Sequence, residues 1–197
     1  HNITTSFDLA QQFYNTESKT APAPIFEVIL PLTTSAEEPL WVYRYYQRFV
    51  VGHAGEELVP GKRRNEWLGE SHPKTINVIP LVEDMDSLSR IDELVGQYLH
   101  YLEELGQSPP YLRVFLARSD PALNYGFLSA TLLNKIALHR LERLERANGI
   151  PIYPIIGVGG VPFRGNFRPG FVDSVLEEYP SVQTFTVQSS FKFDHPS

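Results

Sequence analysis

Short apolar runs alternate with longer amphipathic segments along most of this chain, and this alternation restricts the fold more than any other feature. The runs are rich in Ile, Val, Leu and Phe, a composition that predicts buried strands. They cover residues 25–30, 75–82, 111–117, 150–156 and 182–188. Apolar strands separated by helical crossovers are typical of a parallel sheet that helices cover. The alternation therefore predicts an α/β fold with about five parallel strands.

The segments between the runs have helical periodicity. It predicts helices over residues 36–51, 86–106, 125–148 and 171–179. We expect the apolar residues that share one face of a helix to pack in the core. They are Ile91, Leu94, Tyr98, Leu102 and Leu105 in the second helix and Trp41, Tyr45 and Phe49 in the first. Gly149 follows the third helix and is typical of a residue that ends one.

Both a doubly wound open sheet and a (β/α)8 barrel of the TIM type have this alternation. Polar residues directly after the strands favour the barrel, because strand ends meet there on the face where active sites form. They are Glu83-Asp84, Arg118-Ser119-Asp120 and a glycine loop that begins at Gly157. A complete barrel needs eight strands and about 250 residues. The 197 residues are therefore expected to form an incomplete portion of a barrel.

The chain divides by composition into a lead-in and one domain. Residues 1–24 are polar and end in Ala-Pro-Ala-Pro, so we expect an extended or poorly ordered lead-in. Residues 25–197 are expected to form a partial β/α-barrel catalytic domain. Residues 52–74 are too long for an ordinary connection, which indicates a mobile or functional loop.

Composition excludes several kinds of function. The 17 Lys and Arg against 23 Asp and Glu give a net charge of −6, which argues against a nucleic-acid surface. The chain has no cysteine, so disulfides, thiolate metal sites and a cysteine nucleophile are excluded. The histidines lack the spacing of a zinc site. No apolar run reaches the roughly 20 residues that cross a bilayer, and no signal peptide is recognisable, so we expect a cytoplasmic protein without membrane contact.

Two acidic residues at the strand ends are candidate metal ligands. Glu83 and Asp120 each follow a predicted strand, so their carboxylates can converge on one hard cation such as Mg²⁺. Each residue also has a structural interpretation. Asp120 precedes Pro121 and fits a helix N-cap with proline at the first helical position, and Glu83 fits a solvated loop residue.

The glycine loop carries a candidate cationic group, Arg164. Gly159 and Gly160 would let the backbone approach a ligand closely, and an arginine held by such a loop suits a phosphate or carboxylate. The loop matches neither the P-loop nor the dinucleotide-binding pattern, because Pro162 interrupts the latter. A glycine-rich surface turn with a solvated arginine explains the pattern equally well.

Two further polar residues follow strands. Arg118 either points into the site or forms a structural ion pair, and the residues alone favour the ion pair. Gln188 follows the last strand and is either a ligand contact or ordinary loop polarity.

Several of these segments resemble phosphoenolpyruvate carboxylase, and most closely its shorter archaeal type. The resemblance extends over residues 25–195, in the family's order. The matching segments are Ile25–Ser35 (IFEVILPLTTS), Ile79–Glu83 (IPLVE), Ala117–Asp120 (ARSD), Gly157–Gly165 (GVGGVPFRG) and Gln183–Asp194 (QTFTVQSSFKFD).

The resemblance implies a (β/α)8-barrel carboxy-lyase that joins bicarbonate to phosphoenolpyruvate, giving oxaloacetate and phosphate, with Mg²⁺ or Mn²⁺ as cofactor. By motif match, Glu83 and Asp120 would be the metal ligands and Arg164 the catalytic loop arginine. Arg118, Gly159, Gly160 and Gln188 are the expected substrate-binding residues. The family also implies a homotetramer and a closing lid, for which residues 52–74 and the glycine loop are candidates.

The chain departs from the family pattern in two ways. Val158 stands where the larger bacterial and plant branch has the first arginine of G-R-G-G, and the family's histidine-bearing and later arginine-bearing segments are missing. We therefore expect a fragment with little or no carboxylase activity by itself. Two alternatives stay open: another metal-dependent barrel lyase or aldolase acting on phosphoenolpyruvate or pyruvate, and a non-catalytic truncated barrel module.

Overall fold

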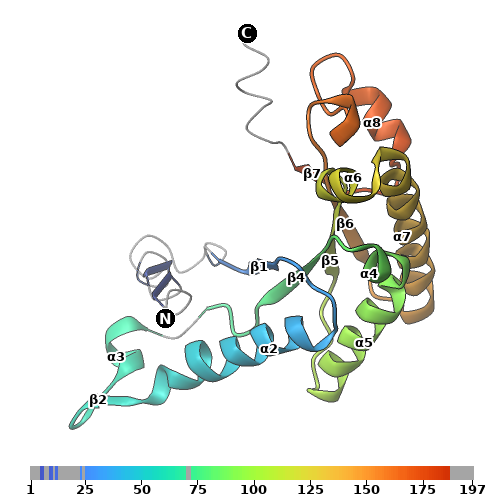
Figure 1. Ribbon diagram of the computed structural model, residues 1–197. Coiled ribbons are helices and arrows are strands. Elements are labelled where there is room, and N and C mark those ends of the chain that lie inside the picture. Colours follow the sequence, from blue (N-terminus) through green and yellow to red (C-terminus); the bar gives the residue numbers. More distant parts are fainter. Residues whose placement is uncertain are drawn as a thin grey trace. The chain divides into compact units, whose positions relative to one another are not determined.

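The computed structural model describes residues 5–6, 9–10, 12, 23, 25–69 and 72–186 (Figure 1). They fall into two compact units. One contains the described residues up to Val28 together with Leu40–Val78, and the other contains Ile29–Pro39 and the described residues from Ile79 onward. Most of the predicted lead-in lies outside the described residues. Within the ranges that the structure describes, no helix is both long and apolar enough to span a membrane.

A five-stranded sheet with the order β1-β4-β5-β6-β7 is the centre of the fold. Its strands are β1 (Glu27–Leu30), β4 (Asn77–Val82), β5 (Leu112–Ala117), β6 (Ile152–Gly157) and β7 (Thr184–Thr186). From β4 to β7 every neighbouring pair is parallel. Beside β4, Asn77 N donates to Phe26 O (3.1 Å) and Thr33 N to Leu81 O (2.9 Å), so these two segments advance in the same direction. The α/β fold and the parallel sheet predicted from the sequence are confirmed.

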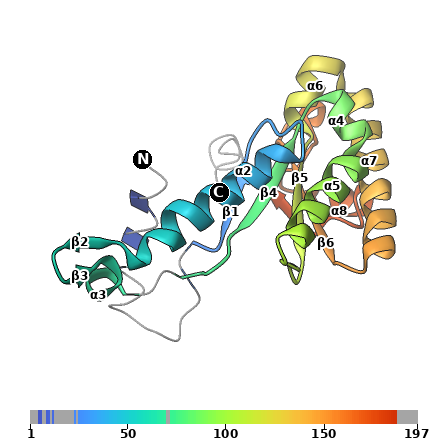
Figure 2. The ribbon, with the colours of Figure 1, turned by 90° about the horizontal axis from the view of Figure 1, so that it is seen from below.

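The strand order distinguishes between the two α/β architectures that fit the sequence. Each strand along the chain is added beside the previous one, without the reversal that a doubly wound sheet contains. Because crossovers between parallel strands are right-handed, an unreversed order places successive helices on one face. In Figures 1 and 2, α5 (Ile91–Glu104) and α7 (Phe127–Asn148) lie together on one side of β5 and β6.

The predicted helix over 86–106 is two helices, α4 (Met85–Ser89) and α5, because Arg90 is not helical (φ −122°, ψ 30°). Asp84 caps α4 by accepting a hydrogen bond from Ser87 N (2.9 Å). The predicted inner face of α5 is confirmed except at its end. The buried residues are Ile91, Leu94, Val95, Tyr98, Leu99 and Leu102. Leu105 is 37% exposed because α5 ends at Glu104.

The polar Asn134 anchors α7 to the end of β5. Asn134 is completely buried, and its Nδ2 donates to Ala117 O (3.0 Å) and to Ala130 O (2.9 Å). Ala117 is the last residue of β5, so this contact fixes the point from which the next loop leaves the sheet. The predicted end of α7 is confirmed: Gly149 is left-handed (φ 71°), and its N–H donates to Glu145 O (2.8 Å).

Two expectations for residues 36–74 are wrong: which face of the first helix is buried, and that residues 52–74 form a loop. Helix α2 (Glu37–Tyr46), with the π turn η1 (Gln47–Val51), buries Tyr43, Tyr46 and Val50, whereas Trp41 on the expected face is 67% exposed. The face with Trp41, Tyr45 and Phe49 and the face with Tyr43, Tyr46 and Val50 are both apolar or aromatic, so helical periodicity alone does not determine which face is buried. Instead of an open loop, much of the 52–74 stretch forms regular elements (Figure 2). They are η2 (Gly52–Gly55), the antiparallel strands β2 (Glu57–Val59) and β3 (Lys62–Arg63), and α3 (Arg64–Leu68).

Candidate active site

Three segments leave the sheet at the carboxyl ends of β4, β5 and β6, and all three belong to the second unit. They carry Glu83, Arg118–Asp120 and the glycine loop, respectively. Ala117 and Gly157 lie opposite each other at the ends of β5 and β6, and Arg118 N donates to Gly157 O (3.1 Å). The parallel sheet therefore brings together residues that are far apart in the chain.

The two candidate metal ligands interact electrostatically. Partial burial raises the pKa of Glu83, and the negative charges of Asp120 and then Asp84 raise it further. Glu83 and Asp120 are thus close enough to repel each other, and a cation would relieve this repulsion. Asp120 is not the N-cap of its helix, because α6 (Ser119–Tyr125) begins one residue earlier, with Arg118 at the cap position. Its carboxylate faces Arg164 Nη2 instead.

The donor set fits a hard divalent cation with few protein ligands. Carboxylate oxygens are the ligands that Mg²⁺ and Mn²⁺ prefer. Among the residues that the structure describes, no group of three or more His, Cys, Asp or Glu could enclose a metal ion. A cation held by Glu83 and Asp120 would therefore keep positions for water and substrate, which is the arrangement that Mg²⁺ commonly adopts.

The glycine loop is closed on itself. Gly159 N donates to Arg164 O (2.8 Å), and Phe167 N donates to Gly159 O (2.9 Å), around the 3-10 turn η3 (Pro162–Arg164). Both backbone groups of Gly159 are thus used inside the loop. Gly160 N–H has no acceptor among the described residues, so it is available to a ligand. Of the two predicted glycine contacts, the geometry favours Gly160.

The closed loop depends on a second glycine. Gly165 has φ +122°, and a Cβ at this position would lie 2.8 Å from Val158 Cγ1. Val158, which replaces the arginine of the larger branch, is 1% exposed and packs beneath the loop. Val158 therefore supports the loop and has no part that could bind a substrate anion.

Replacing Gly165 by alanine is expected to destabilise the protein by about 1–3 kcal/mol, because the residue would combine a strained backbone with a steric clash. It should also displace the neighbouring Arg164. Thermal unfolding measures the first effect. Gly55→Ala is the matched control, because a Cβ at Gly55 would meet no atom within 4 Å. Equal melting temperatures for the two variants would contradict the close packing of Gly165 on Val158.

Arg164 joins the glycine loop to the end of β5. Its Nε donates to Ser119 Oγ, and its Nη2 lies 3.4 Å from Asp120 Oδ1. The side chains of Arg164 and Asp120 are 34% and 59% exposed. Partly exposed ion pairs contribute little stability, so a cation or a substrate anion can replace this one. The structure therefore brings Arg164 beside one of the two candidate metal ligands.

Arg118 is buried, with 3% of its surface exposed. Its Nε donates to Tyr179 Oη (3.3 Å) and its Nη1 to Phe163 O (3.2 Å). The structural ion pair favoured from the sequence is absent from the described part of the chain, where no carboxylate pairs with this guanidinium. Burying a cation without a counter-charge is costly, and a bound anion would offset the cost.

Sequence reasoning missed two members of this site. Ser119 and Tyr179 both contact the arginines; Ser119 was noted only as part of the polar segment Arg118–Asp120 and given no role, and no motif or periodicity singled out Tyr179. The position of Ser119 between Arg118 and Asp120 was the only available signal. Gln188, the remaining predicted contact, lies outside the described residues.

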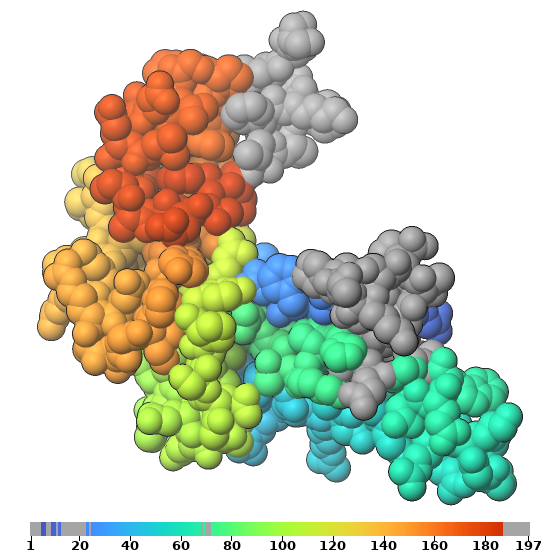
Figure 3. Space-filling view, turned by 180° about the vertical axis from the view of Figure 1, so that it is seen from behind, coloured from blue at the N-terminus to red at the C-terminus, as the bar shows by residue number. Residues whose placement is uncertain are grey.

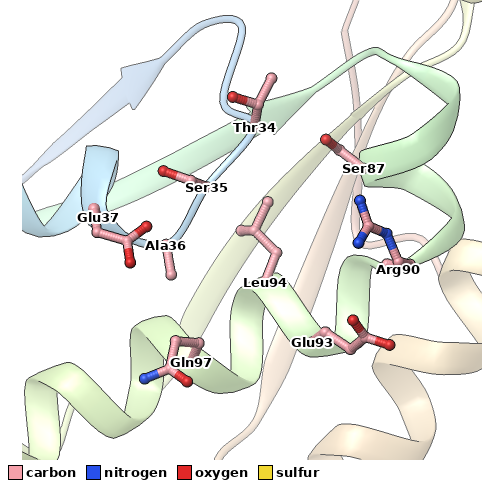
Figure 4. A pocket seen from close by; sticks show the side chains of 9 residues that line it. All are labelled: Thr34, Ser35, Ala36, Glu37, Ser87, Arg90, Glu93, Leu94 and Gln97. Carbon is pink, nitrogen blue, oxygen red and sulfur yellow. The ribbon is translucent and has the colours of Figure 1, made fainter.

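A separate shallow cavity of about 190 Å³ lies between the start of α2 and the helices α4 and α5 (Figure 4). Its lining combines hydroxyl groups with charges of both signs, including Arg90, Glu37 and Glu93. None of the site residues predicted from the sequence lines it. The strand-end cluster is therefore the better candidate for an active site.

Comparison with known proteins identifies the family. A family model described as phosphoenolpyruvate carboxylase matches residues 1–197. Proteins named phosphoenolpyruvate carboxylase from Caldivirga maquilingensis, Pyrococcus abyssi and Halobacterium salinarum are 51%, 50% and 45% identical to the chain, over 98–99% of its residues. The chain spans only 36–39% of the length of these relatives. This match over the whole chain shows that it belongs to the phosphoenolpyruvate carboxylase family.

Proposed function

We propose that this chain supplies the metal-binding and phosphate-binding part of a phosphoenolpyruvate carboxylase. The complete enzyme would join bicarbonate to phosphoenolpyruvate and release oxaloacetate and phosphate. The observation that carries the proposal is the meeting of Arg164, Ser119 and Asp120 at the strand ends, with Glu83 close enough to interact with the charge of Asp120. This cluster would place a cation beside a guanidinium.

The fold proposed for the complete enzyme is a (β/α)8 barrel of the TIM type, of which this chain holds five strands. Two observations support it: the strand order has no reversal, and α5 and α7 lie on one face of the sheet. The polar cluster at the carboxyl strand ends is also where barrel enzymes have their active sites. The family supports a homotetramer as well, which sedimentation of the full-length protein would test.

Glu83 and Asp120 would hold Mg²⁺ or Mn²⁺ in the active enzyme. The bound cation would supply positive charge to substrate oxygens as the phosphate ester is cleaved. Asp120 is paired with Arg164 in this structure, so its carboxylate would pass from the guanidinium to the cation. Arg164 would then be free to bind the substrate beside that cation.

The arginines would bind and stabilise anionic groups of the substrates. Arg164 would stabilise the negative charge on the phosphoryl group during its transfer to bicarbonate, as cationic groups do in other phosphoryl transfers. Arg118 would hold the phosphate or the carboxylate of phosphoenolpyruvate with the N–H donors for which the described residues offer no acceptor. The glycine loop, stiffened by its internal hydrogen bonds, would keep Arg164 close to the reacting atoms.

A coupled assay tests the proposal. A full-length carboxylase that carries this sequence should form oxaloacetate only when phosphoenolpyruvate, bicarbonate and Mg²⁺ are all present. Malate dehydrogenase would report the product through NADH oxidation. The 197-residue chain by itself should show little or no turnover, because it lacks most of the family's length. Consumption of phosphoenolpyruvate or pyruvate without bicarbonate, to give a product other than oxaloacetate, would instead support a lyase or aldolase.

A further inference from the structure

Tyr179 lies directly after α8 (Val172–Glu178) and is 1% exposed. Lys135 of α7 contacts this segment twice. Its Nζ donates to Glu178 O (3.2 Å) and lies 5.7 Å from the centre of the Tyr179 ring. The segments of α7, coloured yellow to orange, and of α8, coloured orange-red, are neighbours on the surface in Figure 3. The phenol is therefore a fixed point against which another side chain can be oriented.

The hydrogen bonds of Arg118 define which of its donors remain for a ligand. A guanidinium has five N–H donors. Tyr179 Oη takes the Nε–H, and Phe163 O takes one N–H of Nη1. Among the described residues no acceptor takes the second N–H of Nη1 or either N–H of Nη2. The Nη2 amino group, whose two N–H donors both lack an acceptor among the described residues, forms one half of the pair with which a guanidinium binds two oxygens of one anion.

The acceptors of Arg118 orient it without cancelling its charge. Burial raises the pKa of Tyr179, and this effect outweighs the opposite effects of its hydrogen bonds with Arg118 and Thr131. The phenol is therefore neutral at physiological pH, and Phe163 O is a neutral carbonyl. A carboxylate in either place would orient Arg118 equally well, but it would compete with a substrate anion for the positive charge.

We propose that Tyr179 is a positioning residue for substrate binding: its phenol oxygen fixes the Arg118 guanidinium with three donors and a full positive charge directed to an anionic group of phosphoenolpyruvate. This inference rests on the proposed function. It assigns to α8 a role in substrate affinity, although α8 contributes no side chain to the metal site. Through Phe163 O, the same guanidinium also holds the glycine loop that carries Arg164.

The test is Tyr179→Phe in a full-length carboxylase that carries this sequence. The variant keeps the ring and its contact with Lys135, and it loses the phenol oxygen with its hydrogen bonds to Arg118 and Thr131. We expect the KM for phosphoenolpyruvate to rise about tenfold, which corresponds to one hydrogen bond to a charged group. The kcat and the KM for bicarbonate should change less than about twofold. An unchanged KM for phosphoenolpyruvate would overturn the inference.

Tyr43→Phe is the matched control. Tyr43 is also buried, with 5% exposed, and its hydroxyl has no hydrogen-bond partner among the described residues. It should leave the KM unchanged, and both variants should keep the melting temperature of the parent enzyme within a few degrees. A rise in KM shared by the two variants would show a general structural effect and would also overturn the inference.

Two further measurements identify the group that Arg118 binds and separate this inference from the proposed function. Inorganic phosphate and pyruvate, used as competitive inhibitors, carry the phosphate and the carboxylate separately. Tyr179→Phe should weaken one of them, and it should add little to the effect of Arg118→Lys, because both changes act on the same guanidinium. If the parent enzyme does not carboxylate phosphoenolpyruvate, the proposed function fails. If the parent enzyme is active and the variant matches it, only the role of Tyr179 fails.

Discussion

Replacing Arg164 by alanine in a full-length carboxylase that carries this sequence should lower kcat/KM for carboxylation about a thousandfold. Arg164 is the only arginine that the structure pairs with Asp120 among the described residues, and it reaches Ser119 at the same strand end. Cationic groups that neutralise a transferring phosphoryl group contribute about 10³- to 10⁵-fold in other enzymes. The coupled assay with malate dehydrogenase measures the loss directly.

Arg168→Ala is the control for this prediction. Arg168 lies on the same loop, but its guanidinium donates to Asn166 Oδ1 (2.9 Å) and lies 4.2 Å from the centre of the Phe171 ring. Its loss should reduce activity only a few-fold. Arg164→Lys should recover part of the activity, because an ammonium keeps the charge without the forked geometry. If Arg164→Ala and Arg168→Ala have similar activities, Arg164 has no catalytic role.

The sheet could be predicted from the sequence because most residues of its strands are apolar. The run TINVIPLV is wholly apolar from Val78 to Val82, so this part fits a buried strand or a buried helix, and its short length favours the strand. The acidic and arginine-bearing segments could be placed at one edge of the sheet because parallel strands have their carboxyl ends together. Local sequence thus determined both the layers and the position of the site.

Tertiary packing decided what the sequence left open. The stripe with Trp41 and the stripe with Tyr43 are both apolar, and only the partner surface determines which one is buried. Likewise, Arg90 is not helical and separates α4 from α5, a break that the apolar periodicity of the segment does not show. The partners of Arg118 lie 45 and 61 residues away in the chain, so no local pattern could reveal them.

Asp120→Asn and Glu83→Gln should each weaken the binding of Mn²⁺ at least about 100-fold. Even the outer hydrogen-bond partners of metal ligands change affinity by about 10- to 100-fold, so the loss of a direct carboxylate ligand should have at least this effect. The two substitutions keep the size of each side chain and remove its charge. The paramagnetic resonance of free Mn²⁺ during titration of the full-length protein measures binding without relying on activity.

Asp86→Asn provides the matched control for the metal titration. Asp86 is an exposed acid in the first turn of α4, three residues after Glu83, and its removal tests for a general effect of lost negative charge.

Arg164→Ala separates the two roles of Asp120, because it breaks the ion pair while both carboxylates stay in place. If the pair exchanges for the cation as proposed, Arg164→Ala should bind Mn²⁺ at least as tightly as the parent protein, since the cation no longer competes with a guanidinium. Equal Mn²⁺ affinity in Asp120→Asn, Glu83→Gln and the parent would show that neither carboxylate is a metal ligand. The proposed metal site at these strand ends would then be wrong.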